Sequence, residues 1–133
     1  MGTAVTSAAG RRQPRRGRGN FELYAWVFMR VSGVLLVLLV LSHFAIMHVF
    51  GRGLDRIDFA FVSGRWANPF WRVYDFALLT LAVIHGGNGL RVIIDDYARS
   101  GTRRLVYQCL NATVIGLTWA LGSLTIFVFT PGG

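Results

Sequence analysis

The sequence predicts an all-α membrane protein with three transmembrane helices. Apolar residues make up 53% of its 133 residues, and only 15% are charged. The apolar residues gather in three stretches, each as long as the roughly 20 residues that a helix needs to cross a bilayer. Because a chain of this length is too short for two domains, we expect one small membrane unit.

The three helices are expected at about residues 26–50, 70–94 and 105–129. Each stretch lacks proline in its interior and is apolar around most of its circumference, unlike the helices of a soluble bundle, which have a polar face. The connection after the first helix is typical of a short interfacial segment, and Asn68-Pro69 predicts that the second helix begins at Pro69 or Phe70.

Arginine placement predicts the orientation of the helices. All 14 basic residues are arginines, and the net charge is +8. Residues 1–20 form a basic, acid-free segment predicted to be a disordered tail, with residues 21–133 as the three-helix membrane domain. Arginines gather in this tail and around the 95–104 connection, whereas the C-terminal residues have none. The positive-inside rule therefore predicts a cytoplasmic N-terminus and an external C-terminus.

Other interpretations of the charge and of the tail carry less weight. Nucleic-acid binding is not expected, because the arginines lie in tails and loops between apolar runs. Met1-Gly2 with Thr6 also fits a myristoylation pattern, and an Arg-rich tail also fits a transit peptide. The single cysteine, Cys109, excludes an internal disulfide and a Cys-x-x-Cys pair.

The second apolar stretch contains the most informative polar residues. His85 lies deep in this span. An imidazole is costly to place in hydrocarbon, so it is expected to have a partner, and a haem iron would be one such partner. At about 100° per residue, His85, Gly89 and Asp96 lie on one helical face. Gly89 would leave a notch that admits a flat macrocycle or a neighbouring backbone. Asp96 and Tyr97, at the membrane edge, would suit a quinone headgroup.

Helix geometry predicts two polar layers. His43 lies about 20 Å beyond Arg30, and His85 about 18 Å from Tyr97, so the two histidines should reach a similar depth. Arg30, Ser32, Asp96 and Tyr97 would form the other layer, near the cytoplasmic surface. Simpler roles remain open: the histidines could bond across helix interfaces, the glycines could serve tight packing, and Arg30 could extend to lipid headgroups.

The motif His85-x-x-x-Gly89 followed by Asp96-Tyr97 resembles the second helix of the small hydrophobic anchor subunits of succinate dehydrogenase. The opening Asn20-Phe21-Glu22 and Arg30-x-Ser32-Gly33 are similar to actinobacterial members of that family. The larger anchor of the family resembles this chain in Arg30-x-Ser32-Gly33 and in His85 to Arg91. That anchor has a histidine directly after the second of these arginines, where this chain has Val92. It also has a serine four residues before the first, where this chain has Trp26. Asp96-Tyr97 therefore favours the smaller, D-type anchor, and the likeness covers about residues 21–129.

The resemblance implies a role in electron transport. Two anchors of this family hold a flavoprotein and an iron–sulfur subunit at a bacterial cell membrane, with a b-type haem between them and a quinone site near the cytoplasmic surface. By this likeness, His85 is the axial haem ligand from this chain, and the second anchor supplies the other. Tyr97 would donate a hydrogen bond to a ubiquinone or menaquinone carbonyl, with Asp96 in support.

Several assignments stay open at this stage. Arg30 and Ser32 are expected to contact either the quinone or a haem propionate, and His43 is a candidate haem neighbour. The chain should not be an enzyme on its own, because it has neither a Gly-rich dinucleotide loop nor a set of cysteines for iron–sulfur clusters. The alternatives are the anchor of a fumarate reductase and a non-redox membrane transporter or scaffold.

Overall fold

The computed structural model describes residues 18–50 and 57–129, and this part of the chain is mostly helical and contains no strand. Helix α1 spans Arg18–Phe44 and continues as the short π-helix η1, Ala45–Val49; α2 is Phe59–Trp66, α3 is Pro69–Tyr97 and α4 is Gly101–Val128. Three of these segments are long and apolar enough to cross a membrane, by length and composition. The predicted fold class, all-α with three transmembrane helices, is confirmed.

The helices extend beyond the stretches expected from hydropathy. The first begins at Arg18, within the expected tail (1–20), the rest of which lies outside the described residues. The third begins at Gly101, where the Ser100 side chain accepts a hydrogen bond from Arg103 N. Hydropathy marks only the part of a helix that is immersed in lipid, whereas capped polar turns continue the helix into the headgroup region.

The start of α3 follows the sequence prediction. Pro69 occupies the first turn, and the Asn68 side chain accepts a hydrogen bond of 2.9 Å from Phe70 N. Proline suits this position because the first-turn amides have no partner inside the helix. The expected interfacial segment before it contains helix α2, whose N-cap, Asp58, accepts a hydrogen bond of 2.7 Å from Phe61 N.

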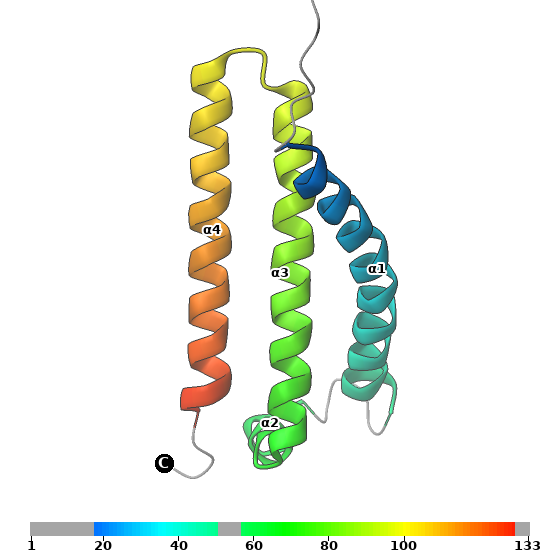
Figure 1. Cartoon of the computed structure of the whole chain (residues 1–133). Coiled ribbons are helices and arrows are strands. Elements are labelled where there is room, and N and C mark those ends of the chain that lie inside the picture. Colours follow the sequence, from blue (N-terminus) through cyan, green and yellow to red (C-terminus); the bar gives the residue numbers. More distant parts are fainter. Residues whose placement is uncertain (1–17, 51–56, 130–133) are drawn as a thin grey trace, which may run out of the picture.

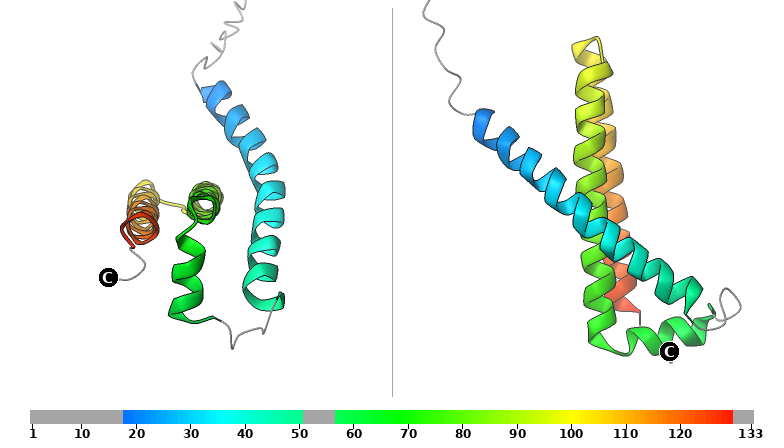
Figure 2. Two further views of the ribbon diagram at one scale, coloured as in Figure 1. Left: turned by 90° about the horizontal axis from the view of Figure 1, so that it is seen from below. Right: turned by 90° about the vertical axis from the view of Figure 1, so that its right-hand side faces the viewer.

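Helix α3 lies between the other two long helices (Figure 1). It runs antiparallel beside α4, while α1 crosses it at a wide angle on the other side (Figure 2). Glycines permit the close approach of α3 to α4: a β-carbon on Gly87 would overlap the side chain of Ile115, and one on Gly122 would lie 2.6 Å from Leu79 Cδ2. Small residues at such contacts are how membrane helices gain packing without a hydrophobic driving force.

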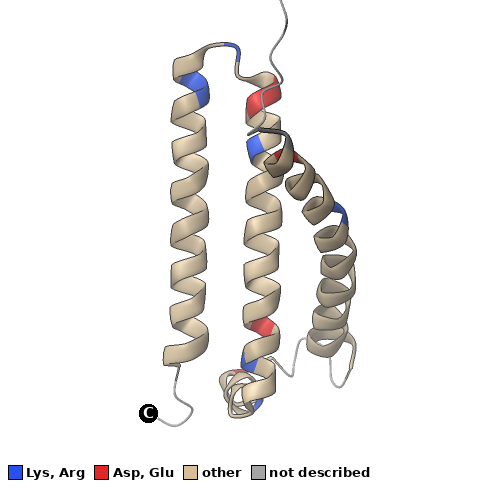
Figure 3. Cartoon of the chain, viewed as in Figure 1, with Lys and Arg blue, Asp and Glu red and all other residues tan. Residues whose placement is uncertain are grey.

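Large apolar side chains are exposed on all three long helices, among them Leu38, Ile93 and Leu124. The charged residues gather mostly near the two ends of the bundle (Figure 3). In a membrane these exposed apolar faces would contact acyl chains or other helices rather than water. The outer faces of the long helices are thus apolar, and polar contacts are confined to a few places between helices. One of these places is the candidate site.

Candidate functional site

His85 has a polar partner from another helix. Its Nδ1 lies 2.8 Å from Oγ of Ser32, at the place where α1 crosses α3. Ser32 is only 1% exposed, so water does not reach its hydroxyl. Among the described residues, no side chain bonds to the other ring nitrogen, Nε2. The pair therefore holds the imidazole ring on one edge and leaves the opposite nitrogen for a ligand.

An apolar groove borders the ring. His85 lines it together with the α1 residues Gly33, Leu36, Val37, Val40 and Leu41, and the volume is ≈ 400 Å³. Gly33 lies closest to the ring, because a β-carbon there would be 3.5 Å from His85 Cε1. An apolar groove with one polar group is the usual surrounding of a bound cofactor.

The donor set fits one axial ligand to a haem iron. A metal-bound neutral imidazole uses one nitrogen for the metal and carries its proton on the other, which bonds to a neighbouring acceptor. His85 has that second bond through Ser32. The described residues contain no group of three or more His, Cys, Asp or Glu side chains placed to hold a metal, so His85 would act as a single protein ligand rather than as part of a protein cage.

Gly89 does not leave an open notch in this chain. A β-carbon there would lie 3.5 Å from Met29 Cε, so the flexible methionine of α1 occupies the space. Gly89 shares the face of His85, and this face packs against α1. The glycine beside the imidazole ring is Gly33 of α1, which the sequence prediction did not place near His85 because it lies on a different helix. A haem contact at Gly89 stays a prediction.

Asp96 and Tyr97 are the last two residues of α3. Asp96 is exposed, and Tyr97 is 81% exposed. A helix of the 29 residues of α3 is about 43 Å long, longer than the hydrocarbon core of about 30 Å, so its end can stand among headgroups. Their side chains are thus available to a partner subunit or a ligand.

Asp95, the acid before Asp96, makes polar contacts with other residues of this chain. Arg104 Nε donates to Asp95 Oδ1 at 2.6 Å, and Gln108 Nε2 donates to the same atom at 2.9 Å. Arg91 lies 3.8 Å from Asp95 and 3.5 Å from Glu22 of α1. This Asp95 cluster joins α1, α3 and α4 at one end. The signal for this cluster in the sequence was the i, i+4 spacing of Arg91 and Asp95.

Arg30 and Ser32 do not share a layer with Asp96 and Tyr97. Arg30 is exposed and its guanidinium lies 4.9 Å from the Trp26 ring. Glu22, not Arg30, meets Arg91 of α3, and Arg91 itself is about 1.7 turns before Tyr97. The cytoplasmic polar layer proposed from the sequence is therefore wrong. Taking Arg30 as the surface level of α1 misplaced the helix, which begins at Arg18 and crosses obliquely.

His43 and His85 are also at different levels. His43 Nδ1 lies 3.3 Å from Asp75, whereas His85 meets Ser32. Ser32 and His43 are about 16 Å apart along α1, and His85 and Asp75 about 15 Å apart along α3. The prediction of a shared depth is wrong for the same reason as above. The structure thus gives His43 a carboxylate partner, and its expected place beside a haem is not supported.

A buried charged cluster surrounds Asp75, a residue that the sequence interpretation did not use. Arg65 of α2 donates to Asp75 Oδ1 at 2.8 Å, and Trp66 Nε1 donates to Oδ2 at 2.8 Å. The side chains of Arg65 and Asp75 are 6% and 14% exposed. An acid inside an apolar stretch was the signal in the sequence, because a membrane carboxylate needs a partner.

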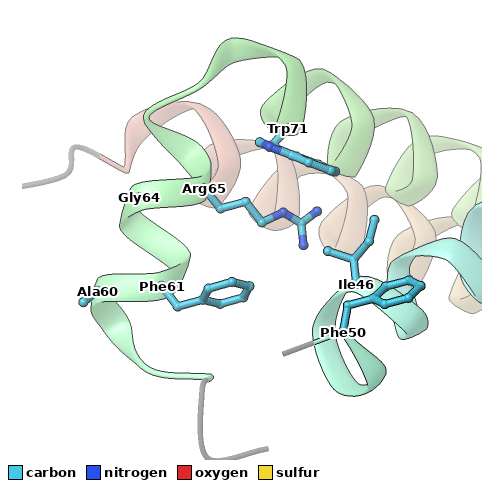
Figure 4. A pocket seen from close by; sticks show the side chains of 7 residues that line it. All are labelled: Ile46, Phe50, Ala60, Phe61, Gly64, Arg65 and Trp71. Atoms are coloured by element: carbon cyan, nitrogen blue, oxygen red, sulfur yellow. The ribbon is translucent and has the colours of Figure 1, made fainter. Parts of the chain in front are cut away.

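The Asp75 cluster borders a pocket between η1 and α2. Its lining residues are Ile46, Phe50, Ala60, Phe61, Gly64, Arg65 and Trp71. Figure 4 shows the Arg65 guanidinium extending between the Trp71 indole and the apolar side chains of the opposite wall, and the distance from Arg65 Cζ to the Trp71 ring is 4.5 Å. Stacking and ion pairing together hold this arginine inside the bundle.

These features define a small multi-pass membrane protein with an oriented imidazole inside the helix bundle. Residues 9–126 match the model of the succinate dehydrogenase/fumarate reductase transmembrane subunit family, and the chain belongs to that family. It is therefore a membrane anchor subunit of this family, and the expected location, a multi-pass protein of a bacterial membrane, agrees with the three apolar helices.

Two named membrane subunits are similar to this chain. The succinate dehydrogenase 2 membrane subunit SdhC of Mycobacterium tuberculosis is 29% identical over 135 residues, covering 98% of this chain and 89% of the relative. The succinate dehydrogenase hydrophobic membrane anchor subunit of Archaeoglobus fulgidus is 38% identical over 107 residues, covering 80% of this chain and 89% of the relative. Both names describe membrane subunits rather than catalytic ones.

Proposed function

We propose that this chain is a membrane anchor of a succinate dehydrogenase and that His85 is one axial ligand of a b-type haem. The observation that carries the haem assignment is the bond between His85 Nδ1 and Ser32 Oγ, 2.8 Å long, beside an apolar groove. It leaves Nε2 as the coordinating atom. A bound b haem would accept and pass on single electrons.

The remaining parts of the complex come from other subunits. His85 is the one histidine that borders this groove, so the second ligand would come from a second anchor, whose helices would cover the apolar groove beside His85. Succinate oxidation belongs to a flavoprotein and an iron–sulfur subunit, since the sequence contains one cysteine and no cluster motif. Exposed apolar faces on α1 and α4 suit such a second anchor and membrane lipid.

The quinone site of this proposal lies at the end of α3. Tyr97 is 81% exposed there and can donate its phenol hydrogen to a quinone carbonyl, which gains negative charge on reduction. Asp96 is beside it and can relay a proton. Because Ser32 is enclosed by His85 and α1, and Arg30 stacks on Trp26, these two residues are not part of the proposed quinone site.

Tyr97→Phe tests the quinone part of the proposal. The variant keeps the ring but loses the donor, so we expect quinone reduction by the complex to fall about 10-fold or more, while succinate oxidation by an artificial acceptor is retained. Tyr107→Phe is the control, since Tyr107 is a half-exposed tyrosine on α4 with no role in the proposed site. Equal losses in both assays, or equal losses in both variants, would argue against a quinone role.

Purification of the complex with its neighbours separates this proposal from its alternatives. We expect a flavoprotein and an iron–sulfur protein among the co-purifying subunits, together with a haem absorbance band. A complex with these subunits that reduces fumarate in preference to oxidising succinate would make the chain a fumarate reductase anchor, because the family includes both. Neither subunit and no haem would favour a non-redox transporter or scaffold.

A further inference from the structure

The hydroxyl of Ser32 is the only contact that the described residues give to the ring nitrogens of His85. Ser32 lies on α1 and His85 on α3, so the contact depends on the crossing of two separate helices. Resting on the proposed role of His85, we propose that Ser32 is a positioning residue that accepts the Nδ1 hydrogen of this imidazole and thereby orients the ring and tunes the haem reduction potential.

The direction of the hydrogen bond follows from the chemistry of a ligated imidazole. Coordination uses the lone pair of Nε2, so the neutral ring carries its proton on Nδ1. Nδ1 is then the donor, and Ser32 Oγ, at 2.8 Å, is the acceptor. The serine therefore satisfies the Nδ1 proton of the tautomer of His85 that can bind the iron.

Burial makes the serine hard to replace by water. Ser32 is 1% exposed, and Gly33 lies against the ring, where a β-carbon would sit 3.5 Å from Cε1. Without the hydroxyl, the Nδ1 proton would face an apolar surrounding with no acceptor, which penalises this tautomer. The ring would also lose the contact that sets its orientation.

The same bond influences the electron density on the ligand. An acceptor on Nδ1–H makes the imidazole a stronger donor to the metal, which stabilises ferric over ferrous iron. Loss of the acceptor therefore shifts the equilibrium toward the reduced haem. Serine is an uncharged acceptor, so its influence is smaller than that of the carboxylate partners that many metal-bound histidines have.

A matched control is present on the same pair of helices. Ser42 of α1 meets Tyr74 of α3 through a hydroxyl contact of 2.5 Å, and among the described residues its hydroxyl bonds to no histidine ring. Ser42→Ala and Ser32→Ala thus each remove one serine contact between α1 and α3. Only Ser32→Ala removes the hydrogen-bond acceptor of the His85 ring.

The experiment is a redox titration of the haem in the purified complex, with haem content measured by absorbance. For Ser32→Ala we expect haem affinity to fall by about 10–100-fold and the reduced-to-oxidised ratio at a fixed potential to rise about tenfold, equivalent to a shift of about 59 mV for a one-electron couple. Ser32→Thr keeps a hydroxyl and should shift the potential less than Ser32→Ala. Ser42→Ala should leave haem content and potential unchanged.

Two results would overturn the proposal. One is a Ser32→Ala complex whose haem content and midpoint potential equal those of the wild type. The other is an equal shift in Ser32→Ala and Ser42→Ala, which would make the serine only a contact between helices. Absence of haem from the wild-type complex would instead refute the haem role of His85, so the two failures are distinguishable.

Discussion

Replacement of His85 by alanine is expected to abolish the Soret band of the b haem in the purified complex. The variant removes the one imidazole that the structure orients toward an apolar groove through Ser32. Haem content should fall to background while the flavoprotein and iron–sulfur subunits still co-purify, because the helix contacts of α3 with α4 lie on other residues. Absorbance spectra of matched amounts of complex provide the measurement.

His43→Ala is the control for this experiment. His43 is the other histidine considered as a haem neighbour, but it lies 3.3 Å from Asp75. We expect the His43→Ala complex to keep its Soret band. An unchanged spectrum in His85→Ala, or a loss of haem in His43→Ala alone, would remove His85 from the ligand assignment.

The second large effect is expected at Asp75. Asp75→Ala leaves the Arg65 guanidinium, with a side chain 6% exposed, without its carboxylate, and also removes the acceptor of Trp66 Nε1. Removing one partner of a buried ion pair costs about 3–5 kcal/mol in general, so the midpoint temperature of thermal unfolding of the complex should fall markedly. Thermal denaturation in detergent, followed by tryptophan fluorescence, is the measurement.

Two further variants identify the cause of this loss. Asp58→Ala removes only the exposed N-cap of α2, so its effect should be smaller, since caps contribute about 0.5–2 kcal/mol. The double variant Arg65→Met, Asp75→Leu removes both charges and should recover a large part of the stability lost in Asp75→Ala. A double variant no more stable than Asp75→Ala would show that the unpaired charge is not the cause.

The residues proposed to contact haem and quinone differ in how closely the structure matches the surroundings that the sequence suggested. His85 was identified from an imidazole in an apolar span, and the structure adds the oriented bond that a ligand needs. Ser32 was expected at a quinone or a propionate, yet its hydroxyl meets His85. The two residues are far apart in the chain, and no periodicity within a single helix can reveal a contact between two helices.

The depth of each residue was harder to obtain than its helix. Depths counted along straight, upright helices placed His43 beside His85, whereas the oblique α1 brings Ser32 to His85 and His43 to Asp75. Tilt is set by packing against neighbouring helices and by anchors at the surface, here Glu22 with Arg91. The length of an apolar stretch reveals neither how a helix packs against its neighbours nor where it is anchored at the surface.

The sequence by itself determined the class of protein, the number of membrane helices and the imidazole inside them. Hydrocarbon excludes unpaired backbone groups, so three apolar stretches of sufficient length can only be helices. The tertiary structure decided which polar groups meet: Ser32 with His85, Arg65 with Asp75, and Met29 against Gly89. Those pairings depend on the crossing of α1 and on the placement of α2, which arise from packing between elements distant in the chain.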